Sequence, residues 1–247
     1  MQTVLITGCS SGFGLEIARH FFDQGWQVVA TMRTPDAFVL PPSERLRILA
    51  LDVTDEASIR TAIDAAGPID ALVNNAGIGV LYPLEGIPMA TARAVFETNT
   101  LGTIAMTQAV LPAFRARRAG VIVNVTSTVT LLPLPLLSVY TASKAAVNAF
   151  TESLALELEP LGIRARLVLP GRSPSTRFGE NARGHMQGEL PEAYAPMLEA
   201  VFGGVRGGGP VTRAQDVADA VWRAVTDPAA PMRMPAGEDA VALAASL

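Results

Sequence analysis

The chain contains a single lysine, Lys144, among its nineteen basic residues, and it occurs in the pattern Tyr140-x-x-x-Lys144. In a helix, positions i and i+4 share a face, so the ammonium and the phenol would point into the same space. A free phenol has a pKa of about 10, and a cation within roughly 4–6 Å lowers that value by about 1–3 units. The pair therefore has the chemistry of a general acid or base near neutral pH. Taken alone, the spacing also fits a lysine on a solvated helix face.

Two further polar residues suit the chemistry of a carbonyl group. Ser127 ends a predicted strand, where its hydroxyl would orient a carbonyl oxygen, although Thr126 and Thr128 offer the same group. Asn99 lies inside the helix predicted over residues 89–117, and asparagine is a poor former of helix interiors. We interpret Asn99 as a functional residue, and a buried amide that bonds to the backbone is the alternative.

Short apolar segments alternate with amphipathic segments of helix length along the chain. Strands that are apolar throughout are typical of a sheet covered on both faces. The alternation predicts an α/β fold with a doubly wound parallel sheet and helices on both faces. Strands are predicted at Val4–Thr7, Gln27–Thr31, Arg47–Leu51, Ala71–Asn74, Val121–Val125, Ala165–Leu169 and near Met232. Helices are predicted at Phe13–Gln24, Glu56–Ala65, Met89–Arg117, Val139–Glu159 and Ala214–Thr226.

Two stretches interrupt this alternation. Prolines between Arg33 and Arg45 leave little room for a helix there. Residues 173–210 contain several prolines and a glycine-rich run, and a long irregular insert is typical of a lid or a binding segment. No repeat or linker divides the chain, so we expect a single domain over residues 1–247 with a substrate-loop insert around 173–210.

A glycine-rich turn joins the first predicted strand to the first helix. Glycines let a pyrophosphate approach the backbone, and the helix N-terminus offers it unpaired N–H groups. The position of the turn favours dinucleotide binding, and a turn with only a structural role is the alternative. Cys9 is expected to pack as a small residue rather than to act as a reactive thiol. The turn reads Thr7-Gly8-Cys9-Ser10-Ser11-Gly12-Phe13-Gly14.

The end of the second strand predicts which dinucleotide binds. An acidic residue there would read the free ribose hydroxyls of NAD(H), but Met32 and Arg33 stand at this place. A guanidinium can pair with a 2′-phosphate, and Ser10 could add a hydrogen bond. We therefore predict that NADP(H) is preferred over NAD(H). A solvated loop arginine is the alternative.

The third and fourth strands end in residues that suit the remaining parts of the cofactor. Asp52 and Val53 follow the third strand, where they would meet the adenine. Asn75, Ala76 and Gly77 follow the fourth strand, at the edge where open α/β sheets bind ligands.

Together these motifs resemble the short-chain dehydrogenase/reductase family over essentially the whole chain. The resemblance implies a Rossmann-type fold and reversible hydride transfer between NAD(P)H and a carbonyl or alcohol. It also implies that Tyr140 is the general acid and base, that Lys144 holds the nicotinamide ribose, and that Asn99 holds a water in a proton relay. The matching residues are the Thr7–Gly14 loop, Asp52, Val53, Asn74 to Gly77, Asn99, Ser127, Tyr140, Lys144, Pro170 and Gly171.

Finer details of the resemblance bear on the substrate and on assembly. Residues 9–14 and 31–33 are most similar to the 17β-hydroxysteroid and retinol dehydrogenase-like branch, whose members act on lipophilic ketones and alcohols. After Pro170-Gly171 the family usually has threonine where this chain has Ser175 followed by Thr176, and either hydroxyl could meet the nicotinamide side. Ser173 and Ser175 are expected on the nicotinamide side. Family members form dimers or tetramers, which implies a homodimer or homotetramer here.

Apolar segments near the predicted site allow two interpretations. Residues 78–82, residues 129–137 and apolar positions of the insert form either a pocket for a bulky small-molecule ketone or alcohol, or core and subunit interface. Two other functions also stay open. One is a non-catalytic NADP(H)-binding sensor or scaffold. The other is a reductase of acyl-thioester-linked ketones, which is disfavoured because the chain lacks the Gly-Gly ending that is common in bacterial acyl-carrier reductases.

Composition limits the remaining function classes. The net charge of −4 predicts no nucleic-acid surface, and no apolar run is long enough to insert into a membrane. A single cysteine permits no intrachain disulfide, and no signal-peptide pattern is present, so we expect a cytoplasmic protein. His20 and His185 lack partners at metal-ligand spacing, so they are interpreted as structural or surface residues and no metal site is expected.

Overall fold

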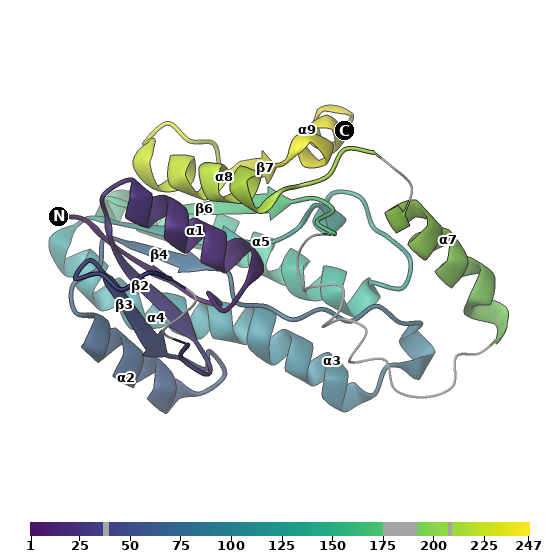
Figure 1. The fold of residues 1–247 in the computed structure, drawn as a ribbon, viewed down its shortest axis with the longest axis horizontal. Helices are drawn as coiled ribbons and strands as arrows, with labels where there is room; N and C mark the ends of the chain where they lie inside the picture. Colours follow the sequence, from purple (N-terminus) through teal and green to yellow (C-terminus); the bar gives the residue numbers. More distant parts are fainter. Residues whose placement is uncertain (37–39, 175–191, 207–208) are drawn as a thin grey trace.

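A parallel sheet of seven strands forms the centre of the fold (Figure 1). The computed structural model describes residues 1–36, 40–174, 192–206 and 209–247. The strand order is β3-β2-β1-β4-β5-β6-β7, and neighbouring strands pair in parallel. The predicted doubly wound parallel sheet is confirmed. Its strands are β1 (Thr3–Ile6), β2 (Gln27–Met32), β3 (Leu46–Ala50), β4 (Ala71–Asn74), β5 (Gly120–Val125), β6 (Ile163–Pro170) and β7 (Arg233–Ala236).

Residues of each central strand alternate between two hydrophobic cores, one on each face of the sheet. Val4 and Ile6 of β1 pack into one core, whereas Leu5 packs into the other. In β5, Val123 and Ile122 are divided in the same way. Because successive side chains of a strand point to opposite faces, a strand covered on both sides needs apolar residues at every position.

Helices cover both faces of the sheet (Figure 1). Helices α1 (Gly12–Asp23) and α8 (Ala214–Thr226) pack into the core that contains Val4, where the Phe21 and Trp222 rings meet edge to face. The opposite core receives α2 (Glu56–Ala66), α4 (Gly102–Arg117) and α5 (Ser138–Leu158). Among the described helices, none combines the length and the apolar character that crossing a membrane requires.

The helix predicted over residues 89–117 has the predicted bounds and contains a π-helical turn. The structure has α3 (Met89–Phe96), a π-helical turn η2 (Glu97–Leu101) and then α4. At this turn the Asn99 carbonyl accepts a hydrogen bond from Thr103 Oγ1 at 2.8 Å, and a Cβ on Gly102 would overlap Val53. Single π-helical turns inside α-helices frequently mark functional sites. The prediction of a helix over residues 89–117 is therefore confirmed, whereas the π-helical turn at Asn99 was not predicted.

Two helices were not predicted. The insert expected to be irregular contains α7 (Ala195–Arg206), preceded by the 3₁₀ turn η5 (Glu192–Tyr194). Pro196 lies in the first turn of α7, where proline is tolerated because the N–H groups of that turn have no helical partner. The chain also ends in a short helix, α9 (Glu238–Ala245). The other predicted strands and helices begin and end within two residues of the observed ones.

A chain of buried polar side chains connects the sheet to α4 and α5. Asn124 Oδ1 of β5 accepts a hydrogen bond from Asn74 Nδ2 of β4 at 2.9 Å. Asn124 Nδ2 donates to Thr151 Oγ1 of α5 at 2.7 Å, and Asn74 Nδ2 also donates to Thr107 Oγ1 of α4 at 3.3 Å. Because an unpaired buried amide is costly, these bonds favour one orientation of α5 on the sheet.

Replacing Asn124 tests this connection. Asn124→Ala should lower the free energy of unfolding by about 1–3 kcal/mol, because Asn74 and Thr151 each lose a buried partner. Denaturant unfolding at pH 7 measures the change. Gln108→Ala, at an exposed position of α4, is the control and should change stability by no more than about 0.5 kcal/mol. Equal stability of the two variants would show that the polar chain contributes nothing.

Candidate functional site

Tyr140 and Lys144 lie one turn apart near the N-terminus of α5, and both are buried, with exposed fractions of 7% and 6%. Lys144 Nζ donates to the carbonyl oxygen of Val125, the last residue of β5, at 2.9 Å. Tyr140 forms a hydrogen bond with the side chain of Ser127, just beyond the same strand. The structure thus gathers three predicted residues at the carboxyl end of β5, and Lys144 does not lie on a solvated helix face.

Burial shifts the protonation equilibria of both α5 residues. It raises the pKa of the Tyr140 phenol well above its usual value, and the hydrogen bond with Ser127 opposes this shift only in part. It lowers the pKa of Lys144 to about 8. The prediction of a lowered phenol pKa is therefore wrong for this structure, because removal from water disfavours the charged phenolate more than its surroundings stabilise it.

Asn99 is fully buried in the π-helical turn, and both its amide oxygen and its amide nitrogen form hydrogen bonds. Its Oδ1 accepts from the Ile78 N–H at 2.8 Å. Its Nδ2 donates to the Ile78 carbonyl at 2.8 Å and to Ser143 Oγ at 3.0 Å. This arrangement fits the alternative of a buried amide that bonds to the backbone. The water relay at Asn99 stays a prediction.

Ser143 is a residue of the site that the sequence reasoning missed. Its Oγ donates to the Tyr140 carbonyl at 2.7 Å, and its own carbonyl accepts from Thr100 Oγ1 at 3.0 Å. Together with the bond from Asn99, these contacts tie the first turns of α5 to the π-helical turn. The available signal was a small hydroxyl residue directly before Lys144, and that signal is weak because serine is common on helix surfaces.

The glycine-rich turn before α1 adopts backbone conformations that favour glycine. Gly8 and Gly12 have φ values of 76° and 60°, and a Cβ on Gly14 would overlap the Gly8 carbonyl oxygen. Ser10 is exposed, Ser11 is the N-cap of α1, and Phe13 packs against the hydrophobic core. The predicted loop residues therefore surround a helix N-terminus.

Cys9 packs inside this turn. It is fully buried, its Sγ donates to the Ile6 carbonyl at 3.3 Å, and burial raises its pKa to about 12. A thiol with this pKa is not a nucleophile at neutral pH. The expectation of simple packing is confirmed.

The residues after β4 brace the glycine-rich turn. Asn75 Nδ2 donates to the carbonyls of Thr7 and Gly8 at 3.0 and 3.2 Å. Thr7 Oγ1 accepts from the N–H groups of Asn75 and Ala76 at 3.0 and 2.9 Å. The Asn75 side chain thus positions the turn. Thr7 belongs to the same support, although the sequence reasoning did not assign it a role.

Gly77 lies beside the α5 residues. A Cβ at this position would be 3.3 Å from Lys144 Nζ and 3.1 Å from Asn99 Oδ1. The absence of a side chain therefore keeps space next to the ammonium. The segment after β4 therefore lies against both Asn99 of the π-helical turn and Lys144 of α5.

Arg33 and Asp52 follow the neighbouring strands β2 and β3. The Arg33 residue is exposed, so its guanidinium is accessible to an anion. Asp52 Oδ1 accepts from the Thr54 N–H at 2.9 Å and from Thr54 Oγ1 at 2.7 Å. These bonds lower the pKa of Asp52, with a smaller contribution from Arg33. Val53 packs against the π-helical region through Gly102.

The turn after β6 contains the last predicted cofactor residues. Pro170 ends the strand, and Gly171, Arg172 and Ser173 follow at partly buried positions. Ser175 and Thr176 lie outside the described residues, as does His185. His20 packs on Trp222, with ring centroids 5.6 Å apart. Within the residues that the structure describes, no three His, Cys, Asp or Glu side chains are arranged to hold a metal ion.

The apolar segment between Ser127 and Tyr140 is divided between core and surface. Val129 and Leu137 pack against Tyr140 in a small buried cluster. Leu132 and Leu134 are each 48% exposed. The segment is therefore not wholly core. Leu132 and Leu134 are the residues that could form either a substrate surface or a subunit interface.

Comparison with known proteins adds a consistent set of relatives. A family model described as short chain dehydrogenase matches residues 2–186. Retinol dehydrogenase 8 from Bos taurus is 36% identical over 255 residues, which cover 94% of this chain and 80% of that protein. The 17-beta-hydroxysteroid dehydrogenase type 1 from Homo sapiens is 38% identical over 180 residues, which cover 67% of this chain and 55% of that protein.

Solved structures with similar folds include proteins bound to either nicotinamide cofactor. A short-chain dehydrogenase from Streptomyces avermitilis has a TM-score of 0.86 at 31% identity, covering 100% of this chain and 92% of its own. Serine dehydrogenase complexed with NADP⁺ has a TM-score of 0.82 at 29% identity, covering 96% and 95%. A short chain dehydrogenase/reductase from Burkholderia phymatum in complex with NAD has a TM-score of 0.81 at 25% identity, covering 95% and 88%.

The buried ammonium predicts a specific dependence of stability on pH. The pKa of Lys144 falls from 10.5 to about 8 on folding, so between these values the unfolded chain holds a proton that the folded protein has released. The free energy of unfolding should therefore rise with pH across this window relative to Lys144→Met, by at most about 3 kcal/mol. Denaturant unfolding of both proteins from pH 7 to 10.5 measures this difference.

Arg60→Met is the matched control for this measurement. It removes a cation whose side chain is 67% exposed, so its stability difference from the wild type should stay nearly constant over the same range. Parallel stability curves for the wild type and Lys144→Met would contradict the burial of a charged Lys144.

Proposed function

The chain belongs to the short-chain dehydrogenase/reductase family of oxidoreductases, which act on alcohols and ketones, and we propose that Tyr140 is its general acid and base. The proposed reaction is hydride transfer between NADP(H) and a lipophilic ketone or secondary alcohol. The buried set of Tyr140, Ser127 and Lys144 at the carboxyl end of β5 carries this proposal. A phenol, a hydroxyl and an ammonium removed from water together form a site for proton transfer to an oxygen atom.

The glycine-rich turn fits a nicotinamide dinucleotide. Its backbone approaches the segment after β4 so closely that a Cβ on Gly8 would lie 2.9 Å from Ala76 Cα, and it leads directly into the N-terminus of α1. Gly8 and residues 10–14 would hold the pyrophosphate, whereas Lys144 would hold the nicotinamide ribose. The bound cofactor supplies or accepts the hydride. Arg33 would pair with the 2′-phosphate of NADP(H), and the exposed Ser10 would support it.

The raised pKa of Tyr140 keeps the phenol protonated at neutral pH, which is the form required for reduction. The phenol would donate its proton to the carbonyl oxygen as the carbonyl carbon gains a hydride, and Ser127 Oγ would orient that oxygen. In the reverse direction, the alcohol proton returns to the phenolate. Lys144, with a pKa of about 8, is mostly protonated at pH 7, so its charge favours the phenolate.

The apolar residues near Tyr140 support a lipophilic substrate. Leu132 and Leu134 expose apolar surface in the segment that links Ser127 to Tyr140. The names of two relatives indicate retinol and a 17β-hydroxysteroid as their substrates.

We also propose a single domain over residues 1–247, assembly into a homodimer or homotetramer, and action in the cytoplasm. Leu156 of α5, which is 74% exposed, supports the assembly.

Tyr140→Phe tests the catalytic proposal. It should lower kcat by about 10²–10⁴-fold, because the proton donor is lost. The Kd for NADPH should change by no more than about twofold, since the ring still packs against Val129 and Leu137. NADPH consumption over aromatic diketones, steroids and retinals gives kcat, and fluorescence titration gives Kd.

The neighbouring hydroxyls provide the controls. Ser127→Ala should also lose turnover, whereas Thr128→Val should keep most of it, because the Ser127 hydroxyl bonds to Tyr140. Tight NADPH binding by the wild type without turnover of any compound would instead favour a non-catalytic sensor or scaffold.

Arg33→Gln tests the cofactor preference. The wild type should have a higher kcat/KM with NADPH than with NADH. The substitution should lower the value for NADPH by at least about tenfold, because a charge-assisted pair with the 2′-phosphate is lost, and should leave NADH nearly unaffected. Arg60→Gln, which removes an exposed cation of α2, should change neither value. A wild type with equal or higher kcat/KM for NADH would refute the preference.

A further inference from the structure

Three segments that are far apart in the sequence meet at Thr212 and Asp239. Asp239 Oδ2 accepts a hydrogen bond from the backbone N–H of Arg172 at 2.6 Å, and Oδ1 accepts from Thr212 Oγ1 at 2.7 Å. Thr212 Oγ1 also accepts from the N–H of Gly171 at 2.9 Å. We call the set of Gly171, Arg172, Thr212 and Asp239 the clasp.

The hydroxyl of Thr212 stands at the centre of the clasp. Thr212 is 1% exposed, and its Oγ1 lies 2.7 Å from both the Ala236 carbonyl oxygen and Asp239 Oδ1. A hydroxyl has one proton, so these two acceptors share it. The Thr212 N–H also donates to the Arg172 carbonyl at 2.8 Å. The Thr212 hydroxyl and the Asp239 carboxylate therefore bond to backbone groups of both the turn after β6 and the end of β7.

Two glycines show how closely the segments of the clasp pack. A Cβ on Gly171 would overlap the Asp239 carboxylate. Gly237 has a φ of 102°, and a Cβ there would lie 2.7 Å from Thr212 Cα. The clasp therefore depends on glycine at positions 171 and 237, whereas a chance contact between surface side chains needs no such backbone.

The clasp lies between the predicted cofactor turn and the base of the insert. Gly171 follows Pro170, the last residue of β6. Arg172 and Thr212 border the two ends of residues 173–211, so their backbone bond closes that segment at its base. Asp239 comes from α9 and is connected to this point through its carboxylate. A carboxylate of the C-terminal helix is therefore hydrogen-bonded to the turn after β6.

We propose that Asp239 is a positioning residue that holds the Pro170-Gly171 turn in the conformation needed to bind the nicotinamide end of NADP(H). This role rests on the proposed function, which assigns that turn to the cofactor. The carboxylate acts through the backbone N–H of Arg172 and through Thr212, and it touches no reacting atom. Charge-assisted bonds of this kind are stronger than bonds between neutral groups, so their loss should loosen the turn.

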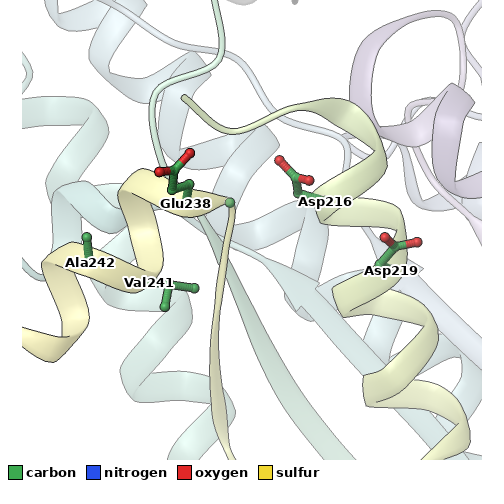
Figure 2. A pocket seen from close by; sticks show the side chains of 6 residues that line it. Asp216, Asp219, Glu238, Val241 and Ala242 are labelled. Carbon is green, nitrogen blue, oxygen red and sulfur yellow. The ribbon is translucent and has the colours of Figure 1, made fainter. Parts of the chain in front are cut away.

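Glu238 separates this role from the general effect of an acid at a helix N-terminus. Glu238 and Asp239 both lie in the first turn of α9, where negative charge is favourable. Figure 2 shows Glu238 beside a surface pocket between α8 and α9, which Asp216, Asp219 and Val241 also line. Glu238→Gln therefore removes a similar charge without removing an acceptor from the clasp.

Four variants of the full chain test the proposal against Glu238→Gln. Asp239→Ala removes both acceptors, and Asp239→Asn retains one carbonyl oxygen. Thr212→Val removes the hydroxyl at nearly constant volume, whereas Thr212→Ser restores it. Backbone hydrogen exchange at Gly171 and Arg172 is measured without cofactor. The Kd for NADPH comes from fluorescence titration, and kcat and KM come from an aromatic diketone. Circular dichroism confirms that each variant is folded.

The expected result is a graded effect on the turn and on cofactor binding. Asp239→Ala and Thr212→Val should speed exchange at Gly171 or Arg172 by about tenfold or more and raise the Kd for NADPH by about tenfold. Asp239→Asn should give a smaller effect. Thr212→Ser and Glu238→Gln should stay within about twofold of the wild type. The KM for NADPH should rise more than kcat falls.

Two outcomes would overturn the role of Asp239 while the proposed function stands. Faster exchange at an unchanged Kd for NADPH would show that the clasp is only structural. Unchanged exchange in folded Asp239→Ala would show that the carboxylate does not hold the turn. If instead the wild type bound no NADPH, the proposed function itself would be wrong, and the positioning role would fail with it.

Discussion

Lys144 is almost completely removed from water, and its Nζ donates a hydrogen bond to the Val125 carbonyl at 2.9 Å. Burial of an ammonium is costly unless its hydrogen bonds are replaced, and the lowered pKa of about 8 reflects this cost. The arrangement persists only if α5 is held firmly at the end of β5. Much of the polar interior can be understood as meeting this requirement.

Two sets of buried bonds hold α5 in place. Asn124, near the carboxyl end of β5, bonds to Thr151 in the second half of the helix. Asn99 and Ser143 connect its first turns to the π-helical turn and to the segment after β4. Each set links α5 to the sheet or to the segment after β4, through partners far away in sequence. Buried networks of this kind stabilise one arrangement because any other leaves polar groups unpaired.

Positioning residues and contact residues are different groups in this site. Thr7, Asn75 and Ser143 face the backbone of the site and bond to it. Ser10 and Arg33 are exposed and available to a ligand. The clasp at Asp239 extends the same principle to the C-terminus, since a side chain of α9 supports the turn after β6. In a parallel sheet the carboxyl ends of the strands lie at one edge, so residues that follow different strands can support the same site.

The sequence by itself determined the strands, all the helices except α7 and α9, the glycine-rich turn and the spacing of Tyr140 and Lys144. These features follow from local periodicity and from the repeat of a helix, so neighbouring residues suffice to predict them. The cofactor preference and the catalytic role of Tyr140 are predictions that rest on the same local patterns.

Only the tertiary structure decided the features that depend on distant partners. In the π-helical turn Asn99 bonds to Ile78, and the clasp joins Asp239 to Arg172. The upward shift of the Tyr140 pKa also depends on the tertiary structure, because burial is its main cause. Sequence spacing predicts which residues lie close together, whereas a pKa depends on how much water the whole fold removes from them, and desolvation is not visible in a sequence.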